Sequence, residues 1–338
     1  MIAIIIKIAI RQIQGNSGID VWTKNLCNGI NQHGHTCSLD LRPGFFQFMP
    51  GILKFRKSSN SYDIIHSNTW SGYAFKDSRP LVITAHHFVN DPEYNPFRTR
   101  SQKLFHRWIY QCERRSLDVA DSVICVSQFT QRKLEEVFGY TCSQVIYNGI
   151  NTSVFRPVEE NPDEWNIPPT KTVIFFAGNL SRRKGADLLP EIMKQLGEHY
   201  ILLLATGQRE ISFGSLNSII NLGHLDLAHL VSAYNRCDIF LSASRLEGFG
   251  LSVAEAMSCG KPVVATNGSA LPELVVDEKG GFLCEMDNVK DFTEKIRLLS
   301  EDKEQMRLMG MFNRNRVIKS FTLEKMVSAY IGLYKSLL

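Results

Sequence analysis

The amino-acid sequence predicts two α/β domains that face each other across a cleft. Short apolar runs alternate with amphipathic stretches along most of the chain, a pattern typical of βα units on a parallel sheet. The alternation stops between residues 156 and 171 and then starts again. A chain of 338 residues is also long for one domain and comfortable for two.

In the first half, the apolar run at 2–10 is interpreted as a buried strand. It is too short to cross a bilayer, contains Lys7 and lacks the cleavage site of a signal peptide. Apolar residues from Ile19 to Ile30 then recur at helical spacing until Gly34. Further strands with polar ends are expected at 62–68, 80–87, 121–127 and 143–149.

Residues 156–171 contain four prolines and four acidic residues without helical periodicity, which indicates a linker. We therefore expect a first domain at 1–157, a linker at 158–170 and a second domain at 171–320. A final amphipathic helix at 321–338 is expected to pack toward the first domain. Strands of the second domain are expected at 172–178, 199–207, 218–223, 238–244 and 261–266.

Composition restricts the class of protein. No apolar run approaches the ~20 residues of a transmembrane helix. The eight cysteines form no CxxC pair, so reduced thiols in a cytoplasmic protein are expected. Residues 1–157 carry a net charge of +7 and the remainder −3. The basic half suggests an anionic surface, and a membrane or a phosphorylated carrier is preferred over nucleic acid.

The stretch "RLEGFGLSVAEAMSCG" (245–260) reads as a glycine turn that opens a short helix. The first amides of such a helix, at Phe249, Gly250 and Leu251, suit a phosphate or diphosphate. Glu255 lies one turn deeper on the same face, where its carboxylate can accept two hydrogen bonds from a ribose diol. A solvated turn before an ordinary amphipathic helix is the alternative.

A second strand, turn and helix lies at "FFAGNLSRRKGADLL" (175–189) and supplies Arg182, Arg183 and Lys184. Such a basic triplet is often only a solvated turn. Here both turns follow strands of one domain, and ligands of open α/β sheets bind at the carboxyl ends of strands. Cations beside helix amides and an acid therefore predict a nucleotide diphosphate site.

These residues resemble a known family. The pattern G-N-L-x3-K-G at 178–185, "LGHL" at 222–225 and E-G-F-G-L-x3-E at 247–255 are similar to motifs of the retaining glycosyltransferases of family 4. "YNGINTSVFRP" at 147–157 resembles the end of that family's N-terminal domain. The resemblance implies the GT-B fold, with two Rossmann-like, doubly wound domains and a C-terminal helix that crosses back to the first.

The resemblance also implies roles for residues of the second domain. Glu255 would hold the ribose, the amides of Phe249, Gly250 and Leu251 the diphosphate, and Lys184 would neutralise the leaving group. Glu247 would contact the transferred sugar near the reacting centre. The loop with Gly223 and His224 would touch the base.

In the first domain, Gly18 matches a glycine that approaches the diphosphate, and His86 matches a histidine near the sugar and acceptor. One position departs from the family, because Asn179 stands where an arginine is usual. Arg182 or Arg183 could replace that cation through phosphate pairing. Otherwise the enzyme is slower or idle. Without a D-x-D motif or histidine–carboxylate ligand spacing, no metal and no cofactor are expected.

The expected reaction is transfer of a sugar from a nucleotide diphosphate sugar, with retained configuration, to a glycan, a lipid-linked or a small-molecule acceptor. A UDP-sugar is favoured over GDP-mannose. The alternatives are an idle nucleotide-sugar-binding protein of GT-B shape and a sugar-nucleotide epimerase. Residues 95–115 carry six cations among aromatic residues, and 45–57 are also basic and aromatic. They predict peripheral contact with the inner face of a membrane or, alternatively, a solvated helix with one core face.

Overall fold

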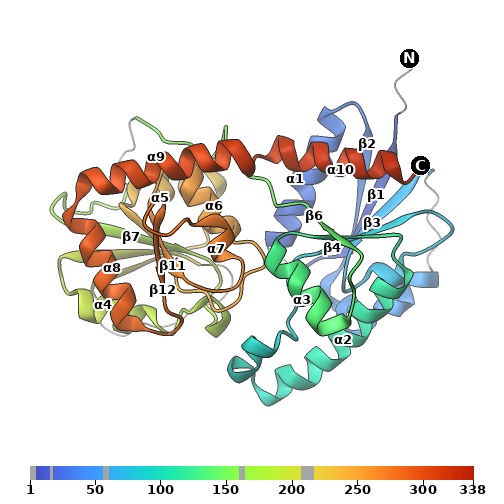
Figure 1. The fold of residues 1–338 in the computed structure, drawn as a ribbon, viewed down its shortest axis with the longest axis horizontal. Helices are drawn as coiled ribbons and strands as arrows, with labels where there is room; N and C mark the ends of the chain where they lie inside the picture. The colour runs from blue at the N-terminus through green and yellow to red at the C-terminus, as the bar shows by residue number, and fades with distance from the viewer. Residues whose placement is uncertain (1–4, 16–17, 56–60, 160–163, 207–216) are drawn as a thin grey trace. The chain divides into compact units, whose positions relative to one another are not determined.

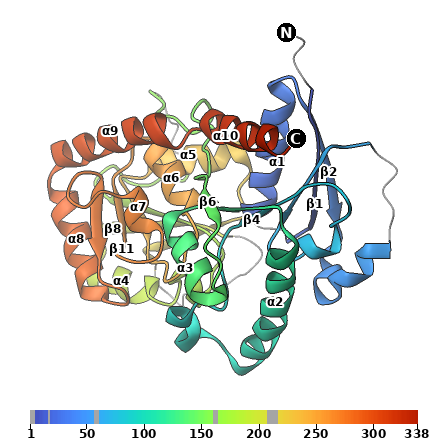
Figure 2. The same ribbon diagram turned by 45° about the vertical axis from the view of Figure 1, so that its right-hand side comes forward.

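The computed structural model describes residues 5–15, 18–55, 61–159, 164–206 and 217–338. The chain forms two compact units. The first unit contains Met1–Gly149 and Leu323–Leu338, and the second contains Ile150–Thr322. Each unit has a six-stranded parallel sheet with helices packed against it (Figures 1 and 2), so the predicted pair of Rossmann-like α/β domains is confirmed.

The sheet of the first unit has the order β2-β1-β3-β4-β5-β6. Its strands are β1 Lys7–Ile13, β2 Thr36–Arg42, β3 Ile64–Asn68, β4 Leu81–Ala85, β5 Ser122–Cys125 and β6 Ser143–Val145. Its α-helices are α1 Gly18–Gln32, α2 Arg100–Val119, α3 Gln128–Phe138 and α10 Leu323–Ser336. Short 3-10 helices η1 Gly44–Phe48, η2 Pro50–Phe55, η3 Gly72–Ala74 and η4 Pro92–Phe97 lie in its loops.

The sheet of the second unit has the order β12-β11-β10-β7-β8-β9. Its strands are β7 Thr172–Ala177, β8 Tyr200–Ala205, β9 Ile219–Gly223, β10 Ile239–Ser242, β11 Val263–Thr266 and β12 Gly281–Cys284. Its helices are η5 Arg182–Lys184, α4 Leu189–Leu196, α5 Leu227–Arg236, α6 Leu251–Ser258, α7 Leu271–Leu274, α8 Val289–Glu301 and α9 Lys303–Ser320.

The first strand begins later than the apolar run at 2–10 suggests. β1 starts at Lys7 and ends at Ile13, and it pairs with β2 and β3 on its two sides. Arg11 and Gln12 are therefore buried although they are polar. Gln12 donates a hydrogen bond of 3.1 Å to Asp20 and accepts one of 3.1 Å from Thr23, so α1 supplies the partners that permit the burial of Gln12.

The C-terminal helix α10 returns to the first unit, as the family resemblance implies. Tyr330 and Tyr334 of α10 are completely buried. The hydroxyl of Tyr334 lies 2.6 Å from Nδ1 of His66 on β3, and that of Tyr330 lies 3.0 Å from Oγ1 of Thr84 on β4. The helix is thus part of the core of the first unit.

The first unit ends at Gly149, earlier than the expected boundary at residue 157. Residues after Gly149 pack on the second unit: Phe155 is buried, and its carbonyl accepts hydrogen bonds from Ser258 and Arg314. The main chain joins the two units at Gly149–Ile150 and again at Thr322–Leu323. The amide of Ile150 donates to the carbonyl of Phe321 at 2.8 Å, so the two passages of the chain are paired.

Candidate functional site

The candidate site of the second unit lies where the strand order of its sheet reverses. β7 and β10 are neighbours, although their sequence positions are far apart. The loops after them therefore leave the same edge of the sheet side by side, which is the usual ligand position in open α/β sheets. One loop contains residues 178–185 and the other contains residues 243–250.

The loop after β7 requires glycine at two positions. Gly178 has φ +155°, and a Cβ atom there would lie 3.6 Å from Cε of Lys184. Gly185 has φ +70°, and its Cβ would lie 2.0 Å from the carbonyl oxygen of Ala243. A side chain cannot fit at that distance, so Gly185 brings this loop against the end of β10. The hydroxyl of Ser181 accepts from the amide of Lys184 and caps η5.

Lys184 and Glu247 form an ion pair between the two loops, with Nζ of Lys184 donating to Oε1 of Glu247. Nη1 of Arg183 lies 3.7 Å from Oε2 of the same carboxylate and donates to the carbonyl of Leu246 at 2.7 Å. The side chains of Lys184 and Glu247 are only 15% and 9% exposed. The structure thus brings together three of the residues singled out in the sequence.

Burial and the neighbouring charges shift the pKa values of this pair in opposite directions. Burial lowers the pKa of Lys184, although the negative charge of Glu247 acts in the other direction. Burial alone would raise the pKa of Glu247, but the positive charges of Lys184 and Arg183 outweigh it and hold that pKa below its ordinary value. The charge of each side chain therefore stabilises the charged form of the other.

Arg245 holds the two loops together through hydrogen bonds to charged and carbonyl groups. Its guanidinium makes two hydrogen bonds to Asp187, of 2.7 and 3.0 Å, and one of 2.6 Å to Asp287. It also donates to the carbonyl of Arg182. The side chain is 4% exposed, and a buried guanidinium requires such charged partners. Arg245 therefore positions the loop that carries Lys184.

Helix α6 begins at the end of the loop after β10. Its N-cap is Gly250, which has φ +100°, and no side chain caps the helix. A Cβ at Gly250 would lie 3.0 Å from Cδ2 of Leu271, so glycine is required for both conformation and space. The amides of the first turn, which begins at Leu251, carry the positive end of the helix dipole. Phe249, just before the cap, is buried and its ring packs on Phe321 at 5.7 Å.

Glu255 lies on the second turn of α6. Its Oε2 accepts a hydrogen bond of 2.7 Å from the hydroxyl of Tyr234, a completely buried residue of α5. Burial raises the pKa of Glu255 to about 7, against the opposing effects of Tyr234 and of the Lys184 charge. Glu255 is thus an acid whose charge changes near neutral pH.

The remaining residues predicted for this site are Asn179, Arg182, Gly223 and His224. Asn179 and His224 are exposed, and Gly223 ends β9 with φ +66°. The guanidinium of Arg182 is 69% exposed, with Nε 3.9 Å from Asp187, so Arg183 and not Arg182 is the loop arginine beside Glu247.

Gly18 and His86 belong to the first unit. Gly18 is the first residue of α1 and is exposed. His86 follows β4, and its ring packs edge-on against Trp22 with a centroid distance of 4.6 Å. Burial lowers the pKa of His86 to about 3, so this histidine is neutral. It lines a pocket of about 240 Å³ at the carboxyl ends of β1 and β3.

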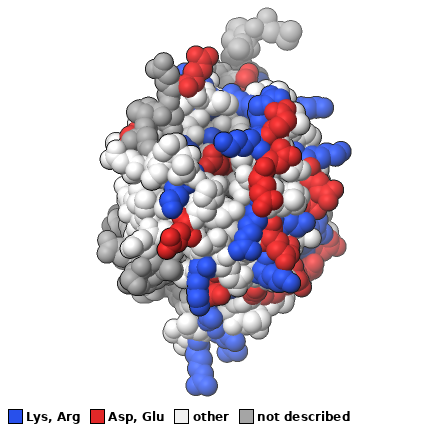
Figure 3. All heavy atoms as spheres, turned by 90° about the vertical axis from the view of Figure 1, so that its left-hand side faces the viewer, with Lys and Arg blue, Asp and Glu red and all other residues white. Residues whose placement is uncertain are grey.

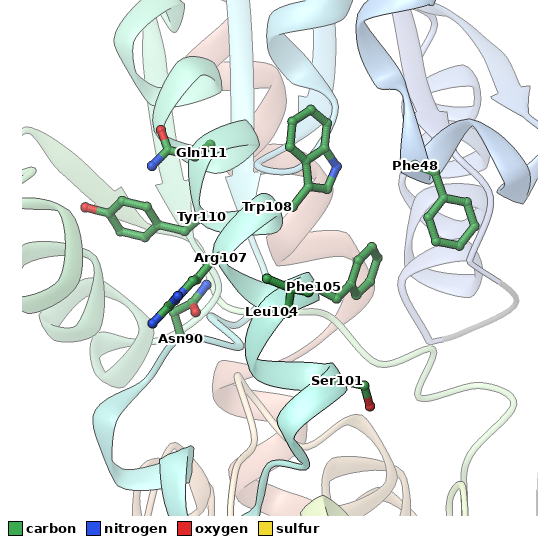
Figure 4. A pocket seen from close by; sticks show the side chains of 9 residues that line it. All are labelled: Phe48, Asn90, Ser101, Leu104, Phe105, Arg107, Trp108, Tyr110 and Gln111. Carbon is green, nitrogen blue, oxygen red and sulfur yellow. The ribbon is translucent and has the colours of Figure 1, made fainter.

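A second, larger hollow of the first unit is a groove of about 840 Å³ along α2 (Figure 4). Phe105 of α2 points toward Phe48 of η1 in this view, the centroids of their rings are 5.6 Å apart, and Trp108 of α2 also lines the groove. Leu104, on the same helix, is 71% exposed. The exposed cations of α2 are Arg100, Lys103, Arg107, Arg114 and Arg115.

Figure 3 shows a face of the molecule on which basic and acidic side chains lie next to one another, unlike α2 with its five exposed cations.

In the described part of the chain, none of the helices combines the length and apolar character of a membrane span. Within those same residues, His, Cys, Asp and Glu side chains form no group of three or more that could hold a metal ion.

Sequence reasoning did not find Arg245 or Tyr234. Arg245 lies two residues before the first residue of the E-G-F-G-L motif, but nothing in the sequence shows that its partners are Asp187 and Asp287. Tyr234 fits the apolar face of α5, and only the fold brings its hydroxyl to Glu255. An arginine shortly after a buried strand was the one available signal.

Two family models match the chain. The one described as Glycosyl transferases group 1 matches residues 157–316, and the one described as Glycosyltransferase Family 4 matches residues 24–154. An uncharacterized glycosyltransferase of Methanocaldococcus jannaschii is 30% identical over 226 residues, which are 64% of this chain and 60% of that relative. The chain thus spans less than two thirds of the length of this relative.

Solved structures share the fold. A sucrose-phosphate synthase of Thermosynechococcus elongatus superposes with a TM-score of 0.87 at 21% identity, over 97% of this chain and 98% of the other. The HepE protein of Anabaena, solved with UDP-glucose, gives a TM-score of 0.77 at 20% identity, over 98% and 99%.

Proposed function

Because the chain belongs to the family 4 glycosyltransferases, we propose that it transfers a sugar from a nucleotide diphosphate sugar to an acceptor hydroxyl, with retained anomeric configuration. The observation that carries this proposal is the buried Lys184–Glu247 pair next to the N-terminus of α6. The pair combines a cation for a diphosphate with an acid for sugar hydroxyls at the strand-order reversal of one sheet.

Donor binding would exchange the partners of this pair. The ammonium of Lys184 would leave Glu247 for the diphosphate, which would also accept hydrogen bonds from the first amides of α6 at Gly250 and Leu251. The freed carboxylate of Glu247 would accept hydrogen bonds from the sugar. Glu255 would hold the ribose, and the loop after β9, with Gly223 and His224, would contact the base.

The proposed chemistry needs no protein nucleophile. The bond from the anomeric carbon to the diphosphate oxygen breaks, and the acceptor oxygen bonds to that carbon on the same face through an oxocarbenium-like state. The acceptor proton passes to the departing phosphate oxygen, which gives a glycoside and a nucleoside diphosphate. Lys184 and the α6 amides would stabilise the negative charge of the leaving group, commonly a large catalytic effect. His86 of the first unit would lie near the acceptor.

The donor is tested with UDP-glucose, the compound present in the Anabaena structure, and with GDP-mannose and ADP-glucose. We expect the UDP-sugar to raise the melting temperature most and to be hydrolysed slowly without acceptor. Lys184→Ala, Glu247→Ala and Glu255→Ala should each lower kcat/KM by about 10²–10³. The exposed Lys194→Ala serves as the control.

Three variants that remained within a few-fold of wild type would contradict the proposal. Tight nucleotide binding without turnover on any acceptor would instead indicate an idle binding protein, the outcome that Asn179 in place of the usual arginine favours. Altered sugar stereochemistry without an acceptor would indicate an epimerase.

We also propose that α2 contacts an anionic membrane surface. Five exposed cations on one helix and the exposed Leu104 beside an aromatic groove provide the two attractions that hold a protein at such a surface. The acceptor would then be presented there, at the inner face of the membrane, as a glycan or a lipid-linked molecule.

The membrane proposal is tested by cosedimentation with vesicles of phosphatidylcholine, with and without phosphatidylserine. Binding should require phosphatidylserine, weaken in high salt and fall in Leu104→Ser and Arg107→Ser. Lys290→Ser, which removes an exposed cation of α8, should not change it. Equal binding to neutral vesicles, or unchanged binding of both α2 variants, would refute the contact.

A further inference from the structure

The pocket of the first unit lies at a second strand-order reversal. In the order β2-β1-β3-β4, the sheet reverses between β1 and β3, and the pocket is lined by residues that follow these two strands. Its volume is about 240 Å³. Since pockets for drug-sized ligands have roughly 300–1,000 Å³, this one suits a single ring.

Three polar atoms in the walls of this pocket are buried and have no hydrogen-bond partner among the described residues. They are Nε1 of Trp70, Nε2 of His86 and Oε2 of Glu113. They come from the loop after β3, the end of β4 and the middle of α2. Buried polar atoms are nearly always hydrogen-bonded, so three such atoms around one pocket point to a ligand that completes their bonds.

Glu113 is the most unusual of the three. The residue is 3% exposed, and its Oε1 accepts a hydrogen bond of 3.1 Å from Oγ1 of Thr69. Burial raises the pKa of Glu113 to about 8, so the side chain keeps its proton at neutral pH. Oε1 bonds to Thr69, which leaves Oε2 without a partner and able to donate to a ligand when the carboxyl group is protonated. The other titratable groups that line the pocket are Asp20, His86 and His87.

The charges around the pocket restrict the ligand. No Lys or Arg is among the described residues that line it, whereas the carboxylate of Asp20 is. An anionic group such as a phosphate would therefore meet an acid without a compensating cation. The donors of Trp70 and Glu113 and the polar nitrogen of neutral His86 instead match hydroxyl groups.

We propose that this pocket binds an uncharged, hydroxyl-rich ring of the acceptor, such as a sugar or cyclitol, and that Glu113 determines this specificity as a neutral hydrogen-bond donor. The proposal rests on the glycosyltransferase function proposed above and adds the chemical class of the acceptor. A pocket that hydrogen-bonds hydroxyl groups rejects analogues that leave its buried atoms unpaired.

The test is binding of glucose, mannose and myo-inositol to the full chain, compared with glucuronate and glucose 6-phosphate, by calorimetry or ligand-observed NMR. At least one neutral ring should bind, and its anionic counterparts should bind at least about tenfold more weakly. Glu113→Gln keeps a neutral donor and should remain within about threefold of wild type, whereas Glu113→Leu should lose at least about tenfold.

Two further variants keep the test decisive. Trp70→Phe removes only the indole donor and should weaken binding even if Glu113→Leu does not fold, and Asp118→Asn removes an exposed acid of α2 and should change nothing. The proposal is overturned if a phosphorylated sugar binds as tightly as its neutral form, if no neutral ring binds, or if Trp70→Phe and every folded Glu113 variant bind like wild type.

UDP-glucose binding is measured on the same samples and separates this proposal from the proposed function. Glu113 and Trp70 variants should bind the donor like wild type. Loss of donor binding in the wild-type protein would contradict the proposed function, whereas normal donor binding with no neutral ring bound would contradict only the assignment of this pocket.

Discussion

The hydroxyl of Tyr234 donates a hydrogen bond of 2.7 Å to Oε2 of Glu255, and this bond joins α5 to α6. It stabilises the ionised carboxyl group and so lowers its pKa, against the larger raising effect of burial. The proposed role of Glu255 as an acceptor of two hydrogen bonds from a ribose therefore depends on a tyrosine of a neighbouring helix.

Tyr234→Phe should raise the pKa of Glu255 above its value of about 7 and reduce the ionised fraction at neutral pH. The affinity for UDP-glucose should fall about three- to tenfold at pH 7, and the loss should shrink at pH 8.5, where the carboxyl ionises again. Calorimetry at several pH values measures both effects. Tyr200→Phe, which removes a hydrogen bond of 2.8 Å to Ser300, is the control. A loss independent of pH would contradict this role of Tyr234.

Lys184→Met should destabilise the ligand-free protein by about 3 kcal/mol, because it removes the closest cation of the buried Glu247 carboxylate and leaves it the more distant Arg183, at 3.7 Å. The double variant Lys184→Met with Glu247→Gln should recover much of that loss. Lys194→Met breaks an exposed pair with Glu191 and should cost at most about 1 kcal/mol. Denaturant unfolding gives these differences, and additive effects of the two site substitutions would show that the pair is not coupled.

Glu113→Gln should make the first unit more stable than wild type at high pH only. The pKa of Glu113 is raised from 4.5 to about 8 in the folded protein, so the unfolded chain binds fewer protons between these pH values. The contribution of Glu113 to stability is therefore full below pH 4.5 and is lost as the pH rises to 8. The melting temperature of the variant relative to wild type should rise by several degrees between pH 5 and pH 8.5, and a constant difference would refute the raised pKa.

Tyr334→Phe should destabilise the first unit by about 1–3 kcal/mol. Nδ1 of His66 loses its hydroxyl partner at 2.6 Å, while Nε2 keeps its bond of 2.8 Å to Thr84, so a buried nitrogen is left unpaired. Tyr110→Phe, whose hydroxyl makes only a long contact of 3.5 Å, should cost much less. Thermal unfolding of the two variants side by side gives the answer, and equal losses would mean that the His66 bond has no special value.

The sequence predicted those features that depend on local pattern. Glycine turns after apolar runs marked the loops that carry Lys184 and Glu247, and the parallel-sheet rule placed both at carboxyl ends of strands. The end of β1 was missed because Arg11 and Gln12 look exposed in sequence, whereas in the structure Asp20 and Thr23 of α1 bond to Gln12 and Asp40 of β2 lies beside Arg11. A polar side chain can be buried where a distant residue completes its hydrogen bonds, so polarity alone is a poor guide to exposure.

Contacts between distant residues could not be predicted. Arg245 reaches Asp187 and Asp287, which are 58 and 42 residues away in sequence. Glu113 precedes Arg114 and Arg115 in the sequence, and only the packing of α2 buries it beside Thr69. Such partners are brought together by the tertiary fold, and the pattern of a single sequence does not show which distant residues will meet.

The return of α10 to the first unit has a consequence for synthesis. All of residues 150–322 are synthesised before the tyrosines at 330 and 334, so the first unit still lacks part of its core while the second unit is being made. The first unit can therefore complete its core only after the second unit has been synthesised. Until then, the apolar surface that α10 covers is exposed and available to chaperones.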